Sequence, residues 1–259
     1  MLTILIGKHL DDARRVLEKF GLTEAAPGET PELVVAHGGD GTLLEAERLY
    51  PGLPKLTLRD AGTAPLCPEH ACEKQVANYL AGGAGVTHLP KLGGFTAGGK
   101  LFGINDVFIH NSQRVNALRY KVWIDGELYA NEIVGDGAGV STIHGSTAYY
   151  RSITHSLFRV GLGLAFSNCT EAVDHLVVPE SSRITLEIVR GPGLMVADNS
   201  PEAIALNEGD RVEIYLTGDS AEVHNLKAFM CPACRLLRHP NRFKESLLSM
   251  LAEEKESAK

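Results

Sequence analysis

The chain has 259 residues, of which 44% are hydrophobic and 22% are charged, as in an ordinary globular protein. This length allows one large domain or two modest ones, each with its own core. The formal net charge of −7 excludes broad electrostatic attraction to nucleic acid or anionic membranes, so any phosphate binding must be local.

The N-terminal sequence and the number of cysteines indicate a cytoplasmic location. The apolar start is short and is followed at once by acids, unlike a signal peptide, and no apolar run approaches the roughly 20 residues that span a bilayer. Five cysteines, an odd number, do not resemble the disulfide framework of a secreted protein. We therefore expect a cytoplasmic protein with neither nucleic acid nor membrane as a partner.

Residues 1–95 alternate between strand and helix patterns, which predicts an α/β domain. Short apolar runs predict strands at Leu2–Gly7, 32–36 and 53–58. Amphipathic stretches predict helices at 11–21, 42–50 and 71–83, the first closed by Gly21. The segment 227–259 is expected to rejoin this domain through an amphipathic helix at Asn241–Glu254.

Residues 96–226 have an apolar period of two, which predicts an all-β domain, a sandwich of two sheets. Tyr120, Val122 and Ile124 alternate with polar or larger neighbours before Asp125-Gly126, a tight hairpin turn. Residues 182–199 repeat this device, with Gly191-Pro192-Gly193 at the bend. A further strand is predicted at 210–218, and one helix-like insertion interrupts the β pattern at 145–156.

The first candidate motif, GGDGT at Gly38–Thr42, lies between a predicted strand and a predicted helix. Glycines let the backbone approach a ligand closely, and the helix N-terminus offers amides to an anion. A turn that merely needs glycine explains the glycine pair equally well. The carboxylate of Asp40 favours chemistry, because an acid beside phosphate weakens binding unless it takes a proton or lies near a metal.

Two further motifs lie in the β half. Asn105 and Asp106 begin a β run and suit ribose hydroxyls, although Asn-Asp is also ordinary turn chemistry. The stretch GDGAGVSTIHGSTAYYRS at 135–152 carries Asp136 and a small-residue helix start followed by Tyr149. Helix capping with a packed tyrosine is the simpler interpretation of that stretch, and contact with a nucleotide is the alternative.

Together, in this order and spacing, the three motifs resemble those of the NAD kinase family, over roughly residues 33–226. The resemblance extends to VDHLVVPESSRI at 173–184 and to the Asp in VADN. It implies an α/β domain followed by a β-sandwich domain, with the active site between them. It also implies transfer of phosphate from ATP or polyphosphate to the adenosine 2′-hydroxyl of NAD, with a divalent metal such as Mg²⁺, in a homodimer or homotetramer.

The resemblance also implies roles for individual residues. Asp40 would be the catalytic base, or would orient the hydroxyl, and Asp136 would meet the nicotinamide end. The phosphate loop would consist of Gly38, Gly39, Gly41 and Thr42. Asn105 and Asp106 would hold the ribose and phosphate region, and the adenine pocket would be lined by Thr147, Ala148, Tyr149 and Ser152. No side chain is assigned as a metal ligand.

The chain departs from the family pattern at several positions. Arg59 and Asp60 replace a neutral glycine-rich loop, and Ile143-His144 replaces a Pro-Thr pair. His37 precedes the glycines where a small or apolar residue is usual; for His37 and His144, a packed or solvated ring is favoured over proton transfer.

The cysteines form two close groups, Cys67 with Cys72 and Cys231 with Cys234. The two groups are compatible with a structural zinc site. Because C-x4-C is a loose spacing for such a site, free or redox-active thiols are the favoured interpretation.

Two other functions compete with NAD phosphorylation. One is a different kinase of the same superfamily, acting on a lipid or another small molecule. The other is a non-catalytic NAD(P)-binding protein, suggested by the altered loop at Arg59–Thr63. The block GSTAY and Asp136 favour a dinucleotide.

Overall fold

The structure is a computed structural model that describes residues 1–63, 65–113, 115–172, 174–227, 231, 233–234 and 237. The chain divides into two compact units. The first contains residues 1–46, 53–87 and the described residues from 222 onward, and the second contains residues 47–52 and 88–221. The predicted helix at Asn241–Glu254 lies outside the described residues.

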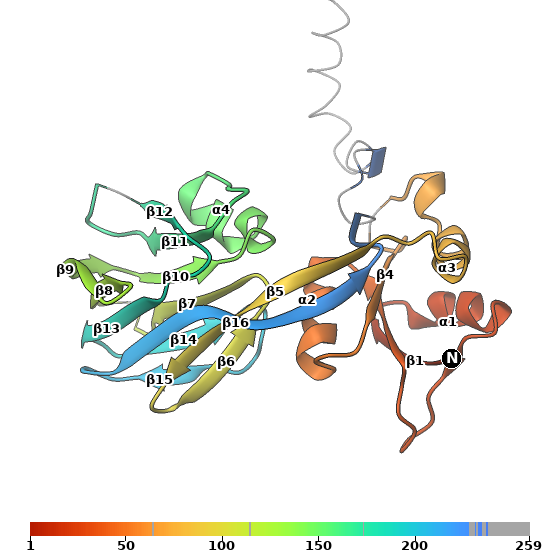
Figure 1. The fold of residues 1–259 in the computed structure, drawn as a ribbon, viewed down its shortest axis with the longest axis horizontal. Helices are drawn as coiled ribbons and strands as arrows, with labels where there is room; N and C mark the ends of the chain where they lie inside the picture. The colour runs from red at the N-terminus through yellow and green to blue at the C-terminus, as the bar shows by residue number, and fades with distance from the viewer. Residues whose placement is uncertain are drawn as a thin grey trace, which may run out of the picture. The chain divides into compact units, whose positions relative to one another are not determined.

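A parallel sheet with helices beside it forms the first unit (Figure 1). Its strands lie in the order β2-β1-β3-β4, with bounds β1 Leu2–Gly7, β2 Thr23–Glu24, β3 Leu33–Gly38 and β4 Lys55–Arg59. The helices are α1 Leu10–Lys19, α2 Asp40–Leu49 and α3 Cys72–Leu80, with a 3-10 turn η1 at Pro68–His70. β3 and β4 are buried along their whole length. β3 is a nearly continuous apolar run, as expected of a strand buried on both faces, whereas β4 alternates Leu56 and Leu58 with the buried polar residues Lys55, Thr57 and Arg59.

One hydrophobic cluster holds α1 and α3 against the strands. Ala13 and Leu17 from α1 and Val76 from α3 pack with residues of β1, β3 and β4 such as Leu5 and Leu56. In Figure 1, α2 lies on the other side of these strands. The strand at Leu2–Gly7 is confirmed, and the other predicted elements of this half are found within a few residues of their expected ends.

Two antiparallel sheets form the second unit. One sheet contains β16-β13-β8-β9 with β5 and β6 alongside, and the other has the order β12-β11-β10-β7-β14-β15. The bounds are β5 Val86–Thr96, β6 Gly99–Gly103, β7 Asp106–Asn111, β8 Leu118–Ile124, β9 Glu127–Gly135, β10 Gly137–Ser141, β11 Leu162–Ser167, β12 His175–Val178, β13 Ile184–Arg190, β14 Gly193–Ala197, β15 Ile204–Leu206 and β16 Arg211–His224. The helix-like insertion consists of a 3-10 turn η2, Gly145–Thr147, and α4, Tyr149–Thr154.

The core of the second unit lies between its two sheets. Val107 and Ile109 of β7 and Val140 of β10 join a cluster with Tyr120 of β8 and Leu186 of β13. The predicted sandwich is therefore confirmed. The hairpin at Asp125-Gly126 is confirmed as well, since both residues have positive φ (53° and 84°) and β8 pairs with β9.

The second predicted hairpin, across Gly191-Pro192-Gly193, is wrong. β13 pairs with β8 and β16, whereas β14 pairs with β7 and β15 in the other sheet. The bend is a corner at which the chain passes from one sheet to the other. Alternation of apolar residues correctly places Ile184, Leu186 and Ile188 in the core, but it cannot specify which strands pair.

β16 returns the chain to the first unit. Its residues Val223 and His224 pair in parallel with Lys55 and Leu56 of β4. The Asn225 amide donates to the Thr57 carbonyl oxygen at 3.1 Å, and the Thr57 hydroxyl is 2.9 Å from the Asn225 carbonyl oxygen. The chain after β16 thus starts from the edge of the parallel sheet.

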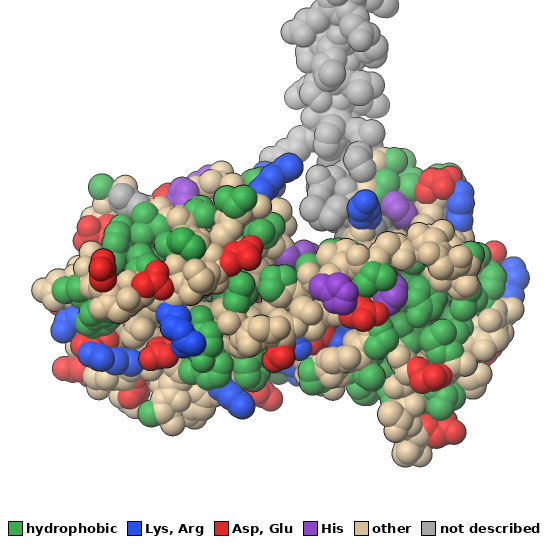
Figure 2. Space-filling model, in the orientation of Figure 1, with side chains coloured by type: hydrophobic (Ala, Val, Ile, Leu, Met, Phe, Trp, Pro, Cys, Tyr) green, Lys and Arg blue, Asp and Glu red, His purple; other side chains and the backbone are tan. Residues whose placement is uncertain are grey.

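Charges of both signs are interspersed on the face drawn in Figure 2, so this face is not one basic surface. Among the described residues, no helix is long and apolar enough to cross a membrane.

Truncation of Leu186 tests the inter-sheet core. Leu186 is fully buried between β8 and β16, so Leu186→Ala is expected to lower the free energy of unfolding by about 2–5 kcal/mol through lost burial and a residual cavity. Urea denaturation measures the change. Leu128→Ala on β9, where the side chain is 52% exposed, is the matched control and should change stability by less than about 0.5 kcal/mol. Equal losses in the two variants would contradict the assignment of the core.

Candidate functional site

The ends of three parallel strands bring the GGDGT motif beside two other loops. β1 and β3 pair up to Gly7 with His37, and β3 and β4 pair up to Gly38 with Arg59. The loops that follow these strands therefore leave the same edge of the sheet. In open parallel sheets this carboxyl edge is where ligands bind, at the point where the strand order reverses, here between β1 and β3.

GGDGT forms the turn from β3 into α2. Asp40 is the first residue of α2, and both Asp40 and Gly41 are exposed. A Cβ at Gly38 would lie 2.2 Å from the Thr42 hydroxyl oxygen, so the turn needs glycine there for Thr42 to fold back onto it. The arrangement presents a helix N-terminus and one carboxylate together, which suits a phosphate with a proton to be removed nearby.

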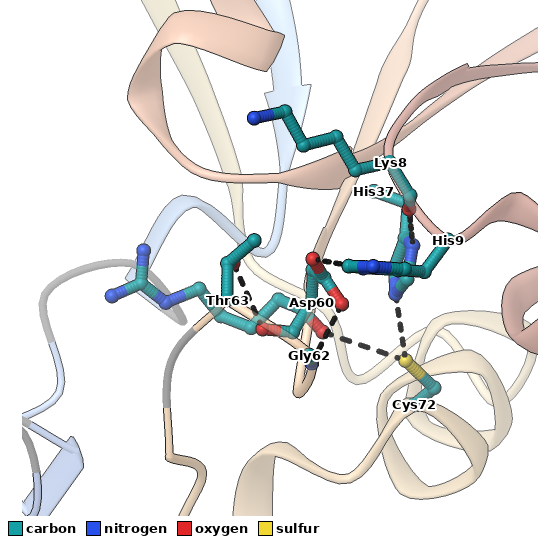
Figure 3. A network of polar contacts seen from close by, with 8 residues as sticks. Lys8, His9, His37, Asp60, Gly62, Thr63 and Cys72 are labelled. Atoms are coloured by element: carbon teal, nitrogen blue, oxygen red, sulfur yellow. Dashed lines mark hydrogen bonds and ion pairs between the residues drawn. The ribbon is translucent and has the colours of Figure 1, made fainter.

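A buried carboxylate organises the altered loop after β4 (Figure 3). Asp60 is 2% exposed; its carboxylate lies 2.9 Å from the His9 Nδ1 and accepts the Gly62 N–H at 2.8 Å. Burial by itself would raise the pKa of Asp60, but hydrogen bonds with His9, Gly62 and Thr63 outweigh it and hold that pKa below 3.8. The Arg59–Thr63 loop, which departs from the family pattern, is thus fixed by the hydrogen bonds of its buried carboxylate, Asp60.

His37 is a packed residue that links β3 to the chain after β1. Its ring is 2% exposed, and its Nδ1 lies 2.7 Å from the Lys8 carbonyl oxygen. A carbonyl only accepts, so Nδ1 carries a proton, and the other ring nitrogen, Nε2, lies 3.7 Å from the Cys72 sulfur (Figure 3). The packed interpretation of His37 therefore agrees with the structure, whereas the role of His144 stays a prediction.

In the second unit, one carboxylate holds the Asn105-Asp106 motif. Asp198 accepts the N–H groups of Ile104, Asn105 and Asp106 at 2.8–3.0 Å, and its own N–H bonds the Asp106 carbonyl oxygen. Three charge-assisted bonds to successive amides fix the backbone at the start of β7. The sequence pattern contained this acid, in VADN, but did not assign it a role.

The stretch around Gly145 packs directly on the Asn105-Asp106 motif. The Thr142 N–H bonds the Asn105 carbonyl oxygen at 2.8 Å, and the Thr142 hydroxyl donates to the Ile104 carbonyl oxygen at 2.7 Å. A Cβ at Gly145 would lie 2.1 Å from the Asn105 oxygen, so only glycine fits this contact. Two motifs that are 40 residues apart in sequence therefore form one local structure.

Tyr149 and Asp136 lie at different places along β7. The Tyr149 ring contacts Phe108 (centroids 5.0 Å apart) and His110 (5.5 Å) and remains 40% exposed. Asp136 lies beside Asn111, whose N–H it accepts through its main-chain oxygen, and its carboxylate accepts from Asn168. The register separates Asp106 from Asn111 by five residues, about 17 Å of strand, so Asp136 is remote from Asn105.

The remaining hydroxyls of this motif bond mainly to nearby backbone. Ser146 is buried and donates to the Ile143 carbonyl oxygen, and Ser152 donates to the Tyr149 oxygen. Thr147 is exposed and Ala148 is half-buried. Ser146 therefore bonds to nearby carbonyl oxygens and does not cap a helix, since neither η2 nor α4 has a side-chain cap hydrogen bond. Thr147, Ala148 and Tyr149 are at least partly exposed.

Comparison of the sequence with known proteins identifies the family of the chain. A sequence profile of the ATP-NAD kinase C-terminal domain matches residues 104–225. The NAD kinase of Nitrosococcus oceani is 30% identical over 210 residues, which cover 73% of this chain and 69% of that protein. The chain belongs to the NAD kinase family.

Other NAD kinases agree with this assignment. That of Natronomonas pharaonis is 33% identical over 171 residues, covering 61% of this chain and 62% of its own. An NAD kinase from Archaeoglobus fulgidus, solved in complex with ATP, matches with a TM-score of 0.72 at 16% identity, over 89% of this chain and 96% of that one. Yeast NADH kinase, solved in complex with NADH, matches with a TM-score of 0.71 at 17% sequence identity, over 86% of this chain and 83% of that one. The NAD kinase fold is thereby confirmed.

Replacement of Asp60 tests the loop by its pH dependence. A carboxyl whose folded pKa lies below its unfolded value contributes stability above the unfolded value and loses it as the pH falls through the folded one. Wild type should therefore exceed Asp60→Asn in unfolding free energy by about 1–3 kcal/mol at pH 7. That difference should shrink as the pH falls below 3.8, measured by urea titrations at a series of pH values.

The matched control is Asp11→Asn. Asp11 is 87% exposed and pairs with Arg14 on the surface of α1, so its replacement should change stability little at any pH. A wild-type advantage over Asp60→Asn that stays constant on acidification would show that Asp60 does not anchor the loop through its charge.

Proposed function

We propose that the chain phosphorylates the adenosine 2′-hydroxyl of NAD to give NADP, with ATP or polyphosphate as donor and a divalent metal. Membership of the NAD kinase family supports the reaction class. The observation that carries the proposal is Asp40, an exposed carboxylate at the first residue of a helix and directly after a glycine turn.

In this proposal Asp40 accepts the proton of the attacking hydroxyl. Phosphoryl transfer depends on positioning and charge stabilisation more than on covalent chemistry, and a positioned base adds to it. Gly38, Gly39, Gly41 and Thr42 surround that base with backbone and one hydroxyl. The N-terminus of α2 adds the dipole that favours transferred phosphate at this turn.

The second unit binds the dinucleotide in this proposal. Asn105 and Asp106, held by Asp198, present an amide and an acid to the ribose. Thr147, Ala148, Tyr149 and Ser152 contribute to an adenine site, in which the exposed Tyr149 ring offers a stacking face. Asp136, remote along β7, takes the nicotinamide end.

The residues at the GGDGT turn suit Mg²⁺ that arrives with ATP. Mg²⁺ prefers hard oxygen ligands and is commonly held by one or two carboxylates together with substrate phosphates. Asp40 supplies an exposed carboxylate beside the phosphate loop. When bound, the metal neutralises phosphate charge; this chain supplies the loop that positions the phosphates and the acid that takes the proton.

The location and assembly belong to the same proposal. A cytoplasmic enzyme that works as a homodimer or homotetramer is what the family resemblance implies. β9 is the edge strand of its sheet and exposes Leu128 and Tyr129, so it offers an apolar edge for such an assembly to cover.

Asp40→Asn tests the catalytic role. Asparagine keeps the size of the side chain but cannot accept the hydroxyl proton, so we expect NADP formation to fall by roughly 100-fold to 10,000-fold. The turnover number is measured with NAD and MgATP. The thermal melting temperature should stay within a few degrees of wild type, because the residue is exposed.

Glu18→Gln is the matched control, since Glu18 is an exposed carboxylate on α1 and should leave turnover unchanged. A well-folded wild-type chain that forms no NADP with ATP, other triphosphates or polyphosphate would overturn the proposal. Thermal-shift screening with sugar phosphates, nucleosides and diacylglycerol would then identify another acceptor, and stabilisation by NAD without turnover would indicate a binding protein.

Tyr149→Ala tests the adenine site. Loss of a stacking ring typically costs about 1–3 kcal/mol per base, so the dissociation constant for NAD should rise roughly 5-fold to 100-fold. Tyr149→Phe keeps the ring and should bind NAD within about twofold of wild type. Isothermal titration with NAD makes the comparison, and an unchanged affinity in the alanine variant would mean that Tyr149 only packs on Phe108 and His110.

A further inference from the structure

Four sulfur and nitrogen ligands from two distant segments meet in the first unit. Cys67 directly precedes the turn η1 and His70 is its last residue, just before α3, whereas Cys231 and Cys234 lie in the segment that follows β16. Their ligand atoms all lie within 4.8 Å of one another. Each segment contributes two ligands separated by two residues, so the combined pattern is C-x2-H with C-x2-C.

The separations fit the edges of a tetrahedron around one metal ion. The Cys67 sulfur lies 3.5 Å from the Cys234 sulfur and 3.9 Å from the Cys231 sulfur. The His70 Nδ1 lies 3.5 Å from the Cys67 sulfur and 3.2 Å from the Cys234 sulfur. Zinc bonds of about 2.3 Å to sulfur and about 2.0 Å to nitrogen place tetrahedral ligands roughly 3.8 Å apart for two sulfurs and roughly 3.5 Å for sulfur and nitrogen.

Two backbone hydrogen bonds hold the cluster together. The His70 N–H donates to the Cys67 carbonyl oxygen at 3.0 Å, which closes the turn η1. The Cys67 N–H also donates to the Cys234 sulfur at 3.3 Å. The first of these bonds fixes the C-x2-H turn that carries Cys67 and His70, and the second brings the Cys234 sulfur of the distant segment against that turn.

Neither a disulfide nor a group of unbound thiols accounts for the cluster as well as a metal does. All five cysteines are free thiols, and the shortest of the sulfur separations above is 3.5 Å, compared with about 2.0 Å in a disulfide. Cys67 and Cys234 are buried, at 7% and 3% exposure, and their sulfurs lie within 4.8 Å of two further ligand atoms. Cys72, which the sequence pattern grouped with Cys67, instead contacts His37 and the Arg59 carbonyl oxygen.

We infer that Cys67, His70, Cys231 and Cys234 bind one Zn²⁺ in a closed, structural site. Soft thiolates with one imidazole in tetrahedral arrangement are the ligand set that zinc prefers, and four protein ligands leave no position for a substrate. His70 coordinates through Nδ1. The charge of Arg59 acts on His70, and this cation partly offsets the net charge of −1 carried by three thiolates and Zn²⁺.

The site ties together two segments that are 164 residues apart in the chain. One is the stretch between the altered loop after β4 and helix α3, and the other is the chain that leaves β16. Closing a long loop in the folded state and burying its ligands makes metal binding part of the folding free energy. The metal is structural, so it contributes stability and order to this edge of the first unit without entering the transfer reaction.

Metal analysis of the full chain tests the site. Protein produced with added zinc and purified under a phosphine reductant should contain about one zinc per chain, measured by inductively coupled plasma mass spectrometry. Cys67→Ser, His70→Ala and Cys234→Ser should each fall below roughly a tenth of an equivalent after dialysis against a weak chelator. Cys169→Ser and Cys72→Ser, which change thiols outside the cluster, are the matched controls and should keep the metal.

His70→Cys guards against misfolding as the cause of metal loss. This variant has four cysteine ligands, which is a common structural zinc site, and it should bind about one zinc per chain. Wild type in which Co²⁺ replaces zinc should show the visible ligand-field bands of tetrahedral geometry and the near-ultraviolet band of thiolate bonds. Removal of the metal from wild type by a strong chelator should lower the melting temperature by more than about 5 °C, reversibly on addition of Zn²⁺.

Three results would overturn the inference, and none depends on the kinase activity. One is a folded wild-type chain that neither retains zinc nor binds Co²⁺ with tetrahedral spectra. Another is equal zinc loss in Cys169→Ser and Cys67→Ser. The third is a Cys67–Cys231 or Cys67–Cys234 disulfide, detected by mass spectrometry of protein prepared without reductant, in a chain that binds no zinc when reduced.

Discussion

In-register parallel pairing of β1, β3 and β4 is the constraint on which the chemistry of the first unit depends. It brings the ends of three strands, Gly7, Gly38 and Arg59, to one edge of the sheet. Asp40 of the GGDGT turn and the anchored Asp60 lie just beyond those ends, and the packed His37 lies next to Gly38 at the end of β3. A one-residue shift of register would turn the side chains of β4 to the opposite face of the sheet and move its loop relative to the other two.

The second unit uses one carboxylate for a comparable purpose. Asp198 accepts three successive amides of the Asn105-Asp106 motif, which lies more than 90 residues earlier in the chain. Thr142 and Gly145 then pack on the same backbone, so two sequence motifs share one support. Asn105 and Asp106, the residues proposed to bind the ribose, are therefore positioned by buried polar contacts to their backbone, which is how a site keeps its geometry without a bound substrate.

Local chemistry allowed much of this structure to be predicted. The apolar run at Leu2–Gly7, the Asp125-Gly126 turn and the alternation at Ile184–Ile188 are readable because each depends on neighbours in sequence. Strand pairing cannot be predicted in this way. The bend at Gly191-Pro192-Gly193 has the composition of a hairpin turn, but it joins strands of two different sheets. The role of Asp198 and the position of Cys72 were also out of reach, because both depend on contacts between segments far apart in the chain. The C-x2-H spacing of Cys67 and His70 could have indicated a metal site, but a search for cysteine pairs alone does not detect it.

The altered loop and the four-ligand cluster form one continuous feature of the chain. The family pattern uses glycines after β4, whereas here Arg59 and Asp60 introduce a buried acid that needs partners, and His9 and Gly62 supply them. Only a few residues later the chain reaches Cys67 and His70. Ordering this loop costs backbone conformational entropy, which its internal hydrogen bonds must offset. They offset it less well if the far end of the loop has no fixed contacts. A metal that fastens Cys67 and His70 to the segment after β16 fixes that far end, so the altered loop and the four-ligand cluster are best understood as parts of a single restraint.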